Sequence, residues 1–111
     1  MAKIHRADLE TARWVQRQVP ADARVLAFGL TATLRFYTPL EAREFFNETP
    51  ETLAALLADG RPTYLVLNVG NVETQWQGRS PQINLHWLRD GPGLEEIGER
   101  NDYTLYRILQ Q

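Results

Sequence analysis

The stretch Thr63-Tyr-Leu-Val-Leu-Asn-Val69 decides the fold class, because it is the most strand-like run in the chain. A helix is expected immediately before it. Thr49 suits the N-cap, Pro50 the first helical position, and Gly60 the glycine that commonly follows a helix. A helix followed by a strand is the pattern of an α/β crossover.

The same pattern occurs earlier in the chain. Apolar spacing predicts a helix over 8–19, and the near-continuous apolar run Arg24-Val-Leu-Ala-Phe28 predicts a strand buried on both faces. A short helix over 30–37 and a strand over 41–46 come next. Right-handed crossovers then give a parallel sheet in which the 24–28 strand lies between the 41–46 and 63–69 strands.

The C-terminal half ends in a hairpin. The polar stretch 71–79 is expected to be a loop, and Ser80-Pro81 predicts the cap and first turn of another helix. Residues 94–99 and 103–109 predict a hairpin of two strands, added antiparallel on the far side of the sheet. Residues 1–111 are therefore predicted to form one α/β domain, a small Rossmann-like three-layer domain with a mostly parallel sheet and a C-terminal antiparallel hairpin.

Composition excludes several classes of protein. The hydrophobic fraction is 43% and the charged fraction 23%, as in soluble globular domains. A net charge of −2 without any basic block argues against a nucleic-acid partner. With no cysteine, disulfides, thiolate catalysis and cysteine zinc sites are excluded. The first six residues lack the apolar segment of a signal peptide.

Ligands of open parallel sheets bind where the strands end at their carboxyl edge. We therefore predict a ligand-binding crevice between the loop after Phe28 and the loop after Val69. Its candidate residues are polar or aromatic side chains and one glycine: Gly29, Thr31, Thr33, Arg35, Tyr37, Asn68, Asn71 and Trp76. Among the tryptophans, Trp76 is the one expected to face a partner, since it stands in a polar stretch.

The chain carries no pattern that predicts catalysis, a cofactor or a metal ion. Gly29 stands alone where a dinucleotide site needs three spaced glycines. Neither His5 nor His86 has a carboxylate or second histidine at ligand spacing, and the cap position explains Ser80. No catalytic residue, cofactor or metal ligand is therefore predicted, although a pair of carboxylates acting as acid and base stays open.

Short segments spread over nearly the whole chain resemble the soluble tails of bacterial membrane glycosyltransferases that use lipid-phosphate sugars, a family that includes protein mannosyltransferases and aminoarabinose transferases. The segments are Trp14-Val-Gln-Arg-Gln-Val-Pro20, Arg24-Val-Leu-Ala-Phe-Gly29, Leu34-Arg-Phe-Tyr37, Pro62-Thr-Tyr-Leu-Val66, Trp87-Leu-Arg89 and Tyr103-Thr-Leu-Tyr-Arg107.

The resemblance implies a non-catalytic accessory domain on the extracytoplasmic side of the bacterial membrane. Its partners would be the membrane-embedded remainder of the parent enzyme and an acceptor or lipid-linked sugar that it helps to recognise. The catalytic carboxylates of the family lie in a loop between the first membrane helices. Nothing in this sequence corresponds to that loop, so no catalytic residue is carried over.

Two further interpretations stay open. The chain could be a free-standing, cytoplasmic module of flavodoxin-like build that binds a ligand or a protein, for example by pairing through an edge strand. It could also be a small enzyme that uses a pair of carboxylates. Membrane-spanning segments encoded upstream of Met1 would favour the glycosyltransferase interpretation over both.

Overall fold

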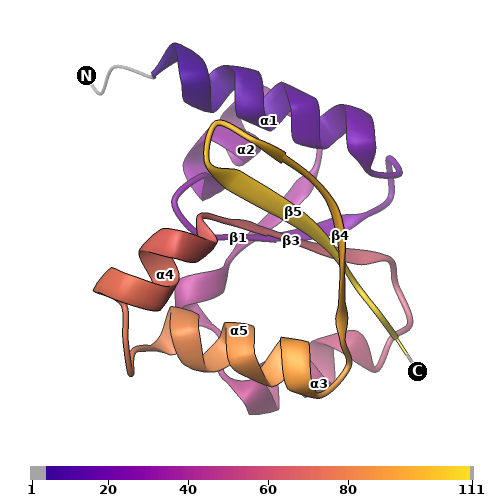
Figure 1. The fold of residues 1–111 in the computed structure, drawn as a ribbon. Coiled ribbons are helices and arrows are strands. Elements are labelled where there is room, and N and C mark those ends of the chain that lie inside the picture. Colours follow the sequence, from indigo (N-terminus) through magenta and orange to yellow (C-terminus); the bar gives the residue numbers. More distant parts are fainter. Residues whose placement is uncertain (1–4, 111) are drawn as a thin grey trace.

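The computed structural model describes residues 5–110, which form one open five-stranded sheet with helices on both faces (Figure 1). The elements in chain order are α1 (Arg6–Gln18), β1 (Arg24–Ala27), α2 (Thr31–Tyr37), β2 (Glu41–Glu44), the 3-10 turn η1 (Phe45–Asn47), α3 (Pro50–Leu57), β3 (Thr63–Leu67), α4 (Val69–Gln75), α5 (Ser80–Asp90), β4 (Leu94–Arg100) and β5 (Tyr103–Ile108). The prediction that the N-terminus is not a signal peptide rests mainly on residues 1–4, which lie outside the described residues.

The sheet has the strand order β2-β1-β3-β5-β4. β1 pairs in parallel with β2 and β3, whereas β5 pairs antiparallel with both β3 and β4. The predicted order, with the 24–28 strand in the middle of three parallel strands and the hairpin added antiparallel, is confirmed. Every residue of β1 and β3 is buried, which explains why both strands are almost continuously apolar.

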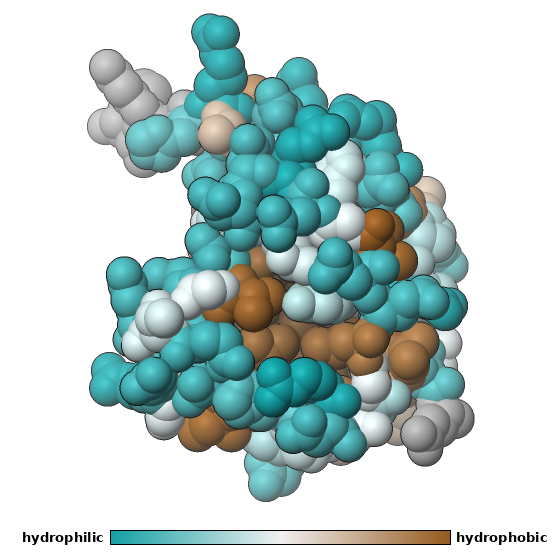
Figure 2. All heavy atoms as spheres, viewed as in Figure 1, coloured by the Kyte–Doolittle hydropathy of each residue, from teal (hydrophilic) through white to brown (hydrophobic). Residues whose placement is uncertain are grey.

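Helices α1 and α2 cover one face of the sheet, and α3, α4 and α5 cover the other (Figure 1). Figure 2 shows hydrophilic side chains over α1 and over α4 and α5, with hydrophobic residues gathered between the two helical layers. Within residues 5–110, no helix combines the length and the apolar character needed to cross a bilayer.

Two expectations are wrong in detail. The predicted strand over 41–46 ends at Glu44, where the carboxylate accepts a hydrogen bond from the Phe46 N–H (3.2 Å) and turns the chain into η1. The stretch expected to be a loop after Gly70 contains α4, which begins directly after β3 with Asn68 as its N-cap. The sequence did not predict this helix because its residues are mostly polar. In addition, its capping residue falls inside the apolar run of the preceding strand.

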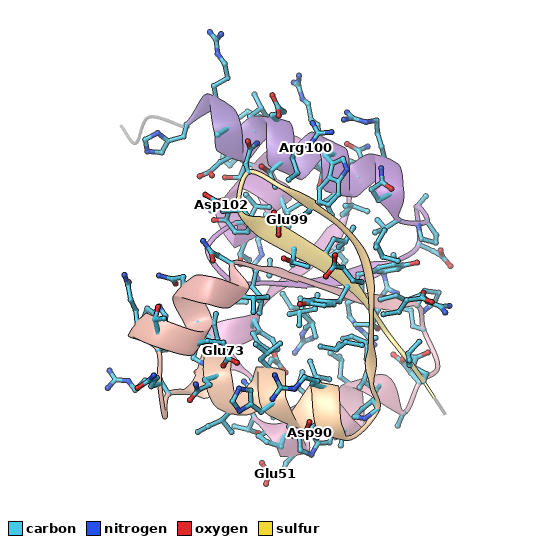
Figure 3. The ribbon with its side chains drawn as sticks, in the orientation of Figure 1. Glu51, Glu73, Asp90, Glu99, Arg100 and Asp102 are labelled. Atoms are coloured by element: carbon cyan, nitrogen blue, oxygen red, sulfur yellow. The ribbon has the colours of Figure 1, made fainter. Side chains whose placement is uncertain are left out.

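The C-terminal hairpin turns on two residues with positive φ, Asn101 (53°) and Asp102 (70°). The Asn101 amide donates hydrogen bonds to the Thr11 hydroxyl (3.0 Å) and to the Ala7 carbonyl (3.2 Å), which fixes the tip of the hairpin against α1. Figure 3 shows this tip beside the helix, with Glu99, Arg100 and Asp102 labelled. The hairpin is therefore fastened to α1 as well as to β3.

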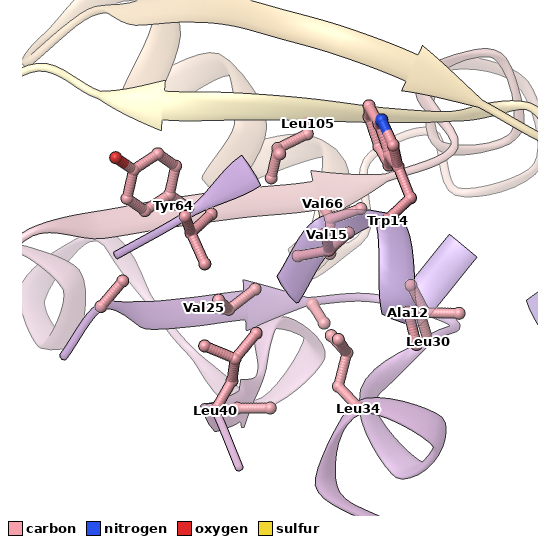
Figure 4. Packing of buried hydrophobic residues seen from close by; sticks show 14 residues of the cluster. Ala12, Trp14, Val15, Val25, Leu30, Leu34, Leu40, Tyr64, Val66 and Leu105 are labelled. Atoms are coloured by element: carbon pink, nitrogen blue, oxygen red, sulfur yellow. The ribbon is translucent and has the colours of Figure 1, made fainter. Parts of the chain in front are cut away.

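The core consists of two clusters, one on each face of the sheet. Figure 4 shows the cluster beneath α1 and α2, where Val15 and Leu34 meet Val25 and Val66 of the sheet. Leu105 belongs to this cluster and Ile108 to the other, as the alternation of side chains along a strand requires. Two packed faces explain how a chain of 111 residues supports a three-layer arrangement.

Candidate functional site

The three parallel strands end at the same edge of the sheet, and each is followed by an element that carries an aromatic ring to that edge. Phe28 follows β1, Phe46 lies in η1 after β2, and Trp76 caps the C-terminus of α4 after β3. The Phe28 N–H donates to the Val66 carbonyl (3.1 Å), which ties its backbone to β3. Parallel topology thus brings together three residues that are far apart in the sequence.

These residues form an aromatic cluster, defined here as Phe28, Phe46 and Trp76. The Trp76 ring stands nearly perpendicular to both phenylalanines, with centroids 5.1 Å from Phe28 and 5.8 Å from Phe46. The two phenylalanine rings are nearly parallel, with centroids 6.3 Å apart. Edge-to-face geometry of this kind is favourable because the positive edge of one ring meets the negative face of another.

Phe46 is the exposed member of the aromatic cluster. Its side chain is 43% exposed, whereas Phe28 and Trp76 are half-buried. The fold holds its backbone in place, since the Ser80 hydroxyl donates to the Phe46 carbonyl (2.7 Å) and the buried Asn84 amide donates to the Glu48 carbonyl (2.8 Å). An exposed ring on a fixed backbone loses little entropy when a ligand packs on it.

The structure gives Gly29 a conformational role. Its φ is +89°, and its carbonyl accepts a hydrogen bond from the Tyr103 hydroxyl (3.2 Å). A Cβ at this position would lie 3.0 Å from that hydroxyl oxygen. Burial raises the pKa of the Tyr103 phenol, with the nearby Asp8 carboxylate adding to the effect. Gly29 therefore lets the chain turn closely beneath the hairpin.

The threonines of α2 point into the protein. Thr31 is buried and its hydroxyl donates to the Ala27 carbonyl (2.9 Å), one turn back along the chain. Thr33 is also buried, at 8% exposure. Both side chains are buried within the layer of α1 and α2. They therefore do not contribute to the aromatic cluster.

Arg35 and Tyr37 lie on the outer side of α2. The Arg35 Nε donates to the Ala42 carbonyl of β2 (2.9 Å), which fastens the helix to the edge strand. Tyr37 is 42% exposed and its ring lies 5.5 Å from that of Phe36. The first predicted loop is thus divided between interior contacts and a separate exposed aromatic pair.

The second predicted group lies on α4 and reaches the aromatic cluster. The Asn68 side-chain oxygen accepts from the Asn71 N–H (3.0 Å), and the Asn71 amide donates to the Gln75 side chain (2.9 Å). These contacts form the first turn of the helix whose far end carries Trp76. Among the predicted site residues, Trp76 is therefore the one that the structure joins to Phe28 and Phe46.

Sequence reasoning missed one pair of ionisable groups. The His86 Nε2 lies 2.6 Å from a Glu73 carboxylate oxygen, so His86 has a carboxylate partner although none stands at ligand spacing in the sequence. This hydrogen bond and the nearby Arg89 guanidinium lower the pKa of Glu73. The pair joins α4, on which Figure 3 labels Glu73, to α5. The sequence does not indicate it, because Glu73 stands 13 residues before His86 in a stretch expected to be a loop.

Other features of the described residues offer less chemistry. Within residues 5–110, no group of three histidine or acidic side chains is arranged to hold a metal ion. A shallow groove of about 260 Å³ runs between α3, α5 and the C-terminal segment, and Leu57, Trp87 and Leu109 line it. Its walls are mainly apolar, so it presents no acid or base to a substrate.

No protein family, no curated protein and no solved structure matches this chain. The resemblance to membrane glycosyltransferase tails therefore remains a prediction from short segments.

Proposed function

We propose that this chain is a non-catalytic recognition domain of a polytopic membrane glycosyltransferase, and that its aromatic cluster packs against a sugar ring of the acceptor or of the lipid-linked donor. The observation that carries the proposal is the convergence of Phe28, Phe46 and Trp76 at the carboxyl edge of the parallel strands. That edge is where open α/β sheets bind their ligands.

The chemistry of the cluster suits a carbohydrate. The C–H groups on one face of a pyranose are weakly positive, and the face of an aromatic ring is negative, so the two attract when they stack. Phe46 is exposed enough to offer such a face, and the hydrogen bond from the Ser80 hydroxyl to the Phe46 carbonyl fixes its segment. The half-buried rings of Phe28 and Trp76 pack against the Phe46 ring, which reduces the freedom lost on binding.

The fold also fits a binding domain. We interpret the three parallel strands with helices on both faces as a small Rossmann-like half whose sheet is completed by an antiparallel hairpin. In such a domain the loops at the carboxyl edge recognise the ligand, while chemistry would require a nearby acid, base or metal. The Glu73–His86 pair belongs to the junction of α4 and α5 and lines no groove described above.

The alternative is a free-standing, flavodoxin-like module that binds a ligand or another protein. Pairing with a second protein through the edge strand β4 is disfavoured by the exposed carboxylates of Glu95, Glu96 and Glu99 and by a β-bulge between Glu96 and Gly98. Charges and bulges of this kind protect edge strands from further pairing. If the chain is such a free-standing module, the aromatic cluster would have the same recognition role in it.

Titration with methyl α-mannoside, followed by ¹H–¹⁵N NMR, tests the sugar-binding part of the proposal. We expect the Trp76 indole signal and the Phe46 amide to shift, and Phe46→Ala to abolish the shifts. Phe36→Ala is the matched control, because it removes an exposed ring from a different helix. Shifts confined to other residues, or equal in both variants, would contradict binding at the aromatic cluster.

Reading the gene upstream of the codon for Met1 tests the membrane part separately. We expect several apolar segments of about 20 residues each, the length that spans a bilayer. A frame that encodes no such segment would leave the sugar-binding domain intact as a proposal and would favour the free-standing module.

A further inference from the structure

Helix α1 carries a line of arginines on its outer surface. Arg6, Arg13 and Arg17 are all exposed, and with Leu9 and Glu10 they line one shallow groove of about 190 Å³ along the helix. From Arg6 to Arg13 the helix rotates to within about 20° of two full turns. From Arg13 to Arg17 it rotates about 40° more than one full turn. The three guanidinium groups therefore share one face over roughly 16 Å of helix length.

These arginines are not used by the fold. Within residues 5–110, none of the three forms an ion pair, whereas Arg24, Arg43, Arg61 and Arg107 each bind a carboxylate. Glu10, the acidic residue within the same groove, is already bound to Arg100 at 3.3 Å. The line is thus a local excess of positive charge on a protein whose net charge is −2.

The neighbouring helix adds exposed aromatic side chains to the same side of the molecule. α1 and α2 pack side by side on one face of the sheet, and each turns its buried residues, such as Val15 and Leu34, toward the strands. The opposite sides of both helices therefore point away from the sheet. On α2 that side carries Phe36, which is 82% exposed, and the ring of Tyr37 lies 5.5 Å away.

We infer that this surface, made of Arg6, Arg13, Arg17, Phe36 and Tyr37, docks on a lipid bilayer that contains anionic phospholipids. Arginines near the headgroups are attracted to the phosphates, and aromatic rings partition into the interface between headgroups and acyl chains. Exposed Phe36 favours a bilayer over nucleic acid, because a duplex backbone offers its ring no apolar layer. The inference stands apart from the aromatic cluster, which lies on the other face of the sheet.

Vesicle co-sedimentation of the 111-residue chain tests the inference. The chain is expected to bind vesicles of phosphatidylcholine mixed with phosphatidylglycerol, and to remain in solution with phosphatidylcholine alone. Added salt should weaken the binding. Arg13→Gln should lower the partition coefficient roughly fivefold, and Arg13→Gln with Arg17→Gln roughly 25-fold, given the usual contribution of one arginine at an anionic surface.

Arg79→Gln is the matched control, since Arg79 is exposed at the start of α5 on the other face of the sheet and should leave binding unchanged. Phe36→Ser should weaken binding without changing its dependence on salt. Circular dichroism confirms that each variant is folded. The inference is overturned if anionic vesicles do not sediment the chain, or if Arg13→Gln and Arg79→Gln behave alike. Binding to duplex DNA as tight as to vesicles and insensitive to Phe36→Ser would also overturn it.

Discussion

At the scale of single residues, Gly29 holds the turn between β1 and α2 in a conformation that other residues avoid. Its φ of +89° and the Tyr103 hydroxyl 3.0 Å from where a Cβ would lie make two separate demands. We predict that Gly29→Ala lowers the free energy of unfolding by more than the 1–2 kcal/mol or so that left-handed backbone alone costs. Urea denaturation measures the change.

Gly60→Ala is the control that separates the two demands. Gly60 also has a positive φ, +71°, but a Cβ there would meet nothing within 4 Å. It should therefore show the backbone cost without the contact with Tyr103. Equal losses of stability in the two variants would mean that the Tyr103 hydroxyl gives way at no cost.

Asp59 balances the buried guanidinium of Arg24, which is 3% exposed and lies 2.9 Å from the carboxylate. The hydrogen bond from Arg24, together with one from the Arg61 N–H, lowers the pKa of Asp59 from 3.8 to about 2. A depressed carboxyl pKa stabilises the fold above the unfolded value, and the effect disappears as pH falls through the folded value.

We therefore predict that Asp59→Asn destabilises the protein at neutral pH and removes part of the loss of stability between about pH 4 and pH 2. Unfolding in urea at a series of pH values measures both effects. Glu51→Gln is the control, since it removes an exposed carboxylate that forms no ion pair among the described residues. An unaltered acid limb in Asp59→Asn would contradict the role assigned to this carboxylate.

At the scale of elements, capping residues and apolar runs in the sequence are sufficient to predict most of the helices and strands. Thr49 and Pro50 begin α3 as predicted, and the apolar runs of β1 and β3 become the central strands. α4 could not be recognised by its periodicity, because glycine, asparagine and threonine are weak helix formers and only Val72 is fully buried. Its one usable signal was Asn68, a favoured N-cap residue that directly follows a strand.

The candidate site shows the same limit. Trp76 could be selected from the sequence because a large aromatic residue in a polar stretch is unusual. Phe28 and Phe46 were assigned to strands, and no sequence pattern connects two phenylalanines to a tryptophan 30 or more residues away. Their proximity depends on the parallel order of β2, β1 and β3, so it becomes visible only when the sheet is assembled.

Since α4 has little else to stabilise its first turn, we predict that it depends strongly on its cap. Asn68→Ala removes the acceptor for the Asn71 N–H and should cost about 1 kcal/mol of stability, whereas Asn68→Asp should retain most of it. The amides of α4 should exchange faster with solvent in Asn68→Ala, and the Trp76 indole signal should shift. Unchanged exchange across α4 would contradict this dependence on the cap.

At the scale of the whole molecule, the sheet joins two cores that share the three inner strands β1, β3 and β5. Residues of β1 and β3 alternate between the cluster beneath α1 and α2 and the cluster beneath α3, α4 and α5. Opening either helical layer exposes one face of these strands while the other stays packed. The outer strands β2 and β4 each have one unpaired edge, and most of β4 is exposed.

This arrangement predicts a hierarchy in native-state hydrogen exchange, because amides of central, doubly buried strands open only when the whole domain unfolds. The amides of β1 and β3 should be the slowest and should report the global free energy of unfolding, while those of α4 and the outer edge of β4 should be the fastest. NMR-detected exchange at increasing denaturant measures this order. The amides that pair β4 with β5 should exchange at intermediate rates, since Asn101 fastens the hairpin tip to α1 and Trp14 packs closely against Gly98. If α4 proved as protected as β3, the two helical layers would have to unfold together, and the division of the molecule into two separable cores would be wrong.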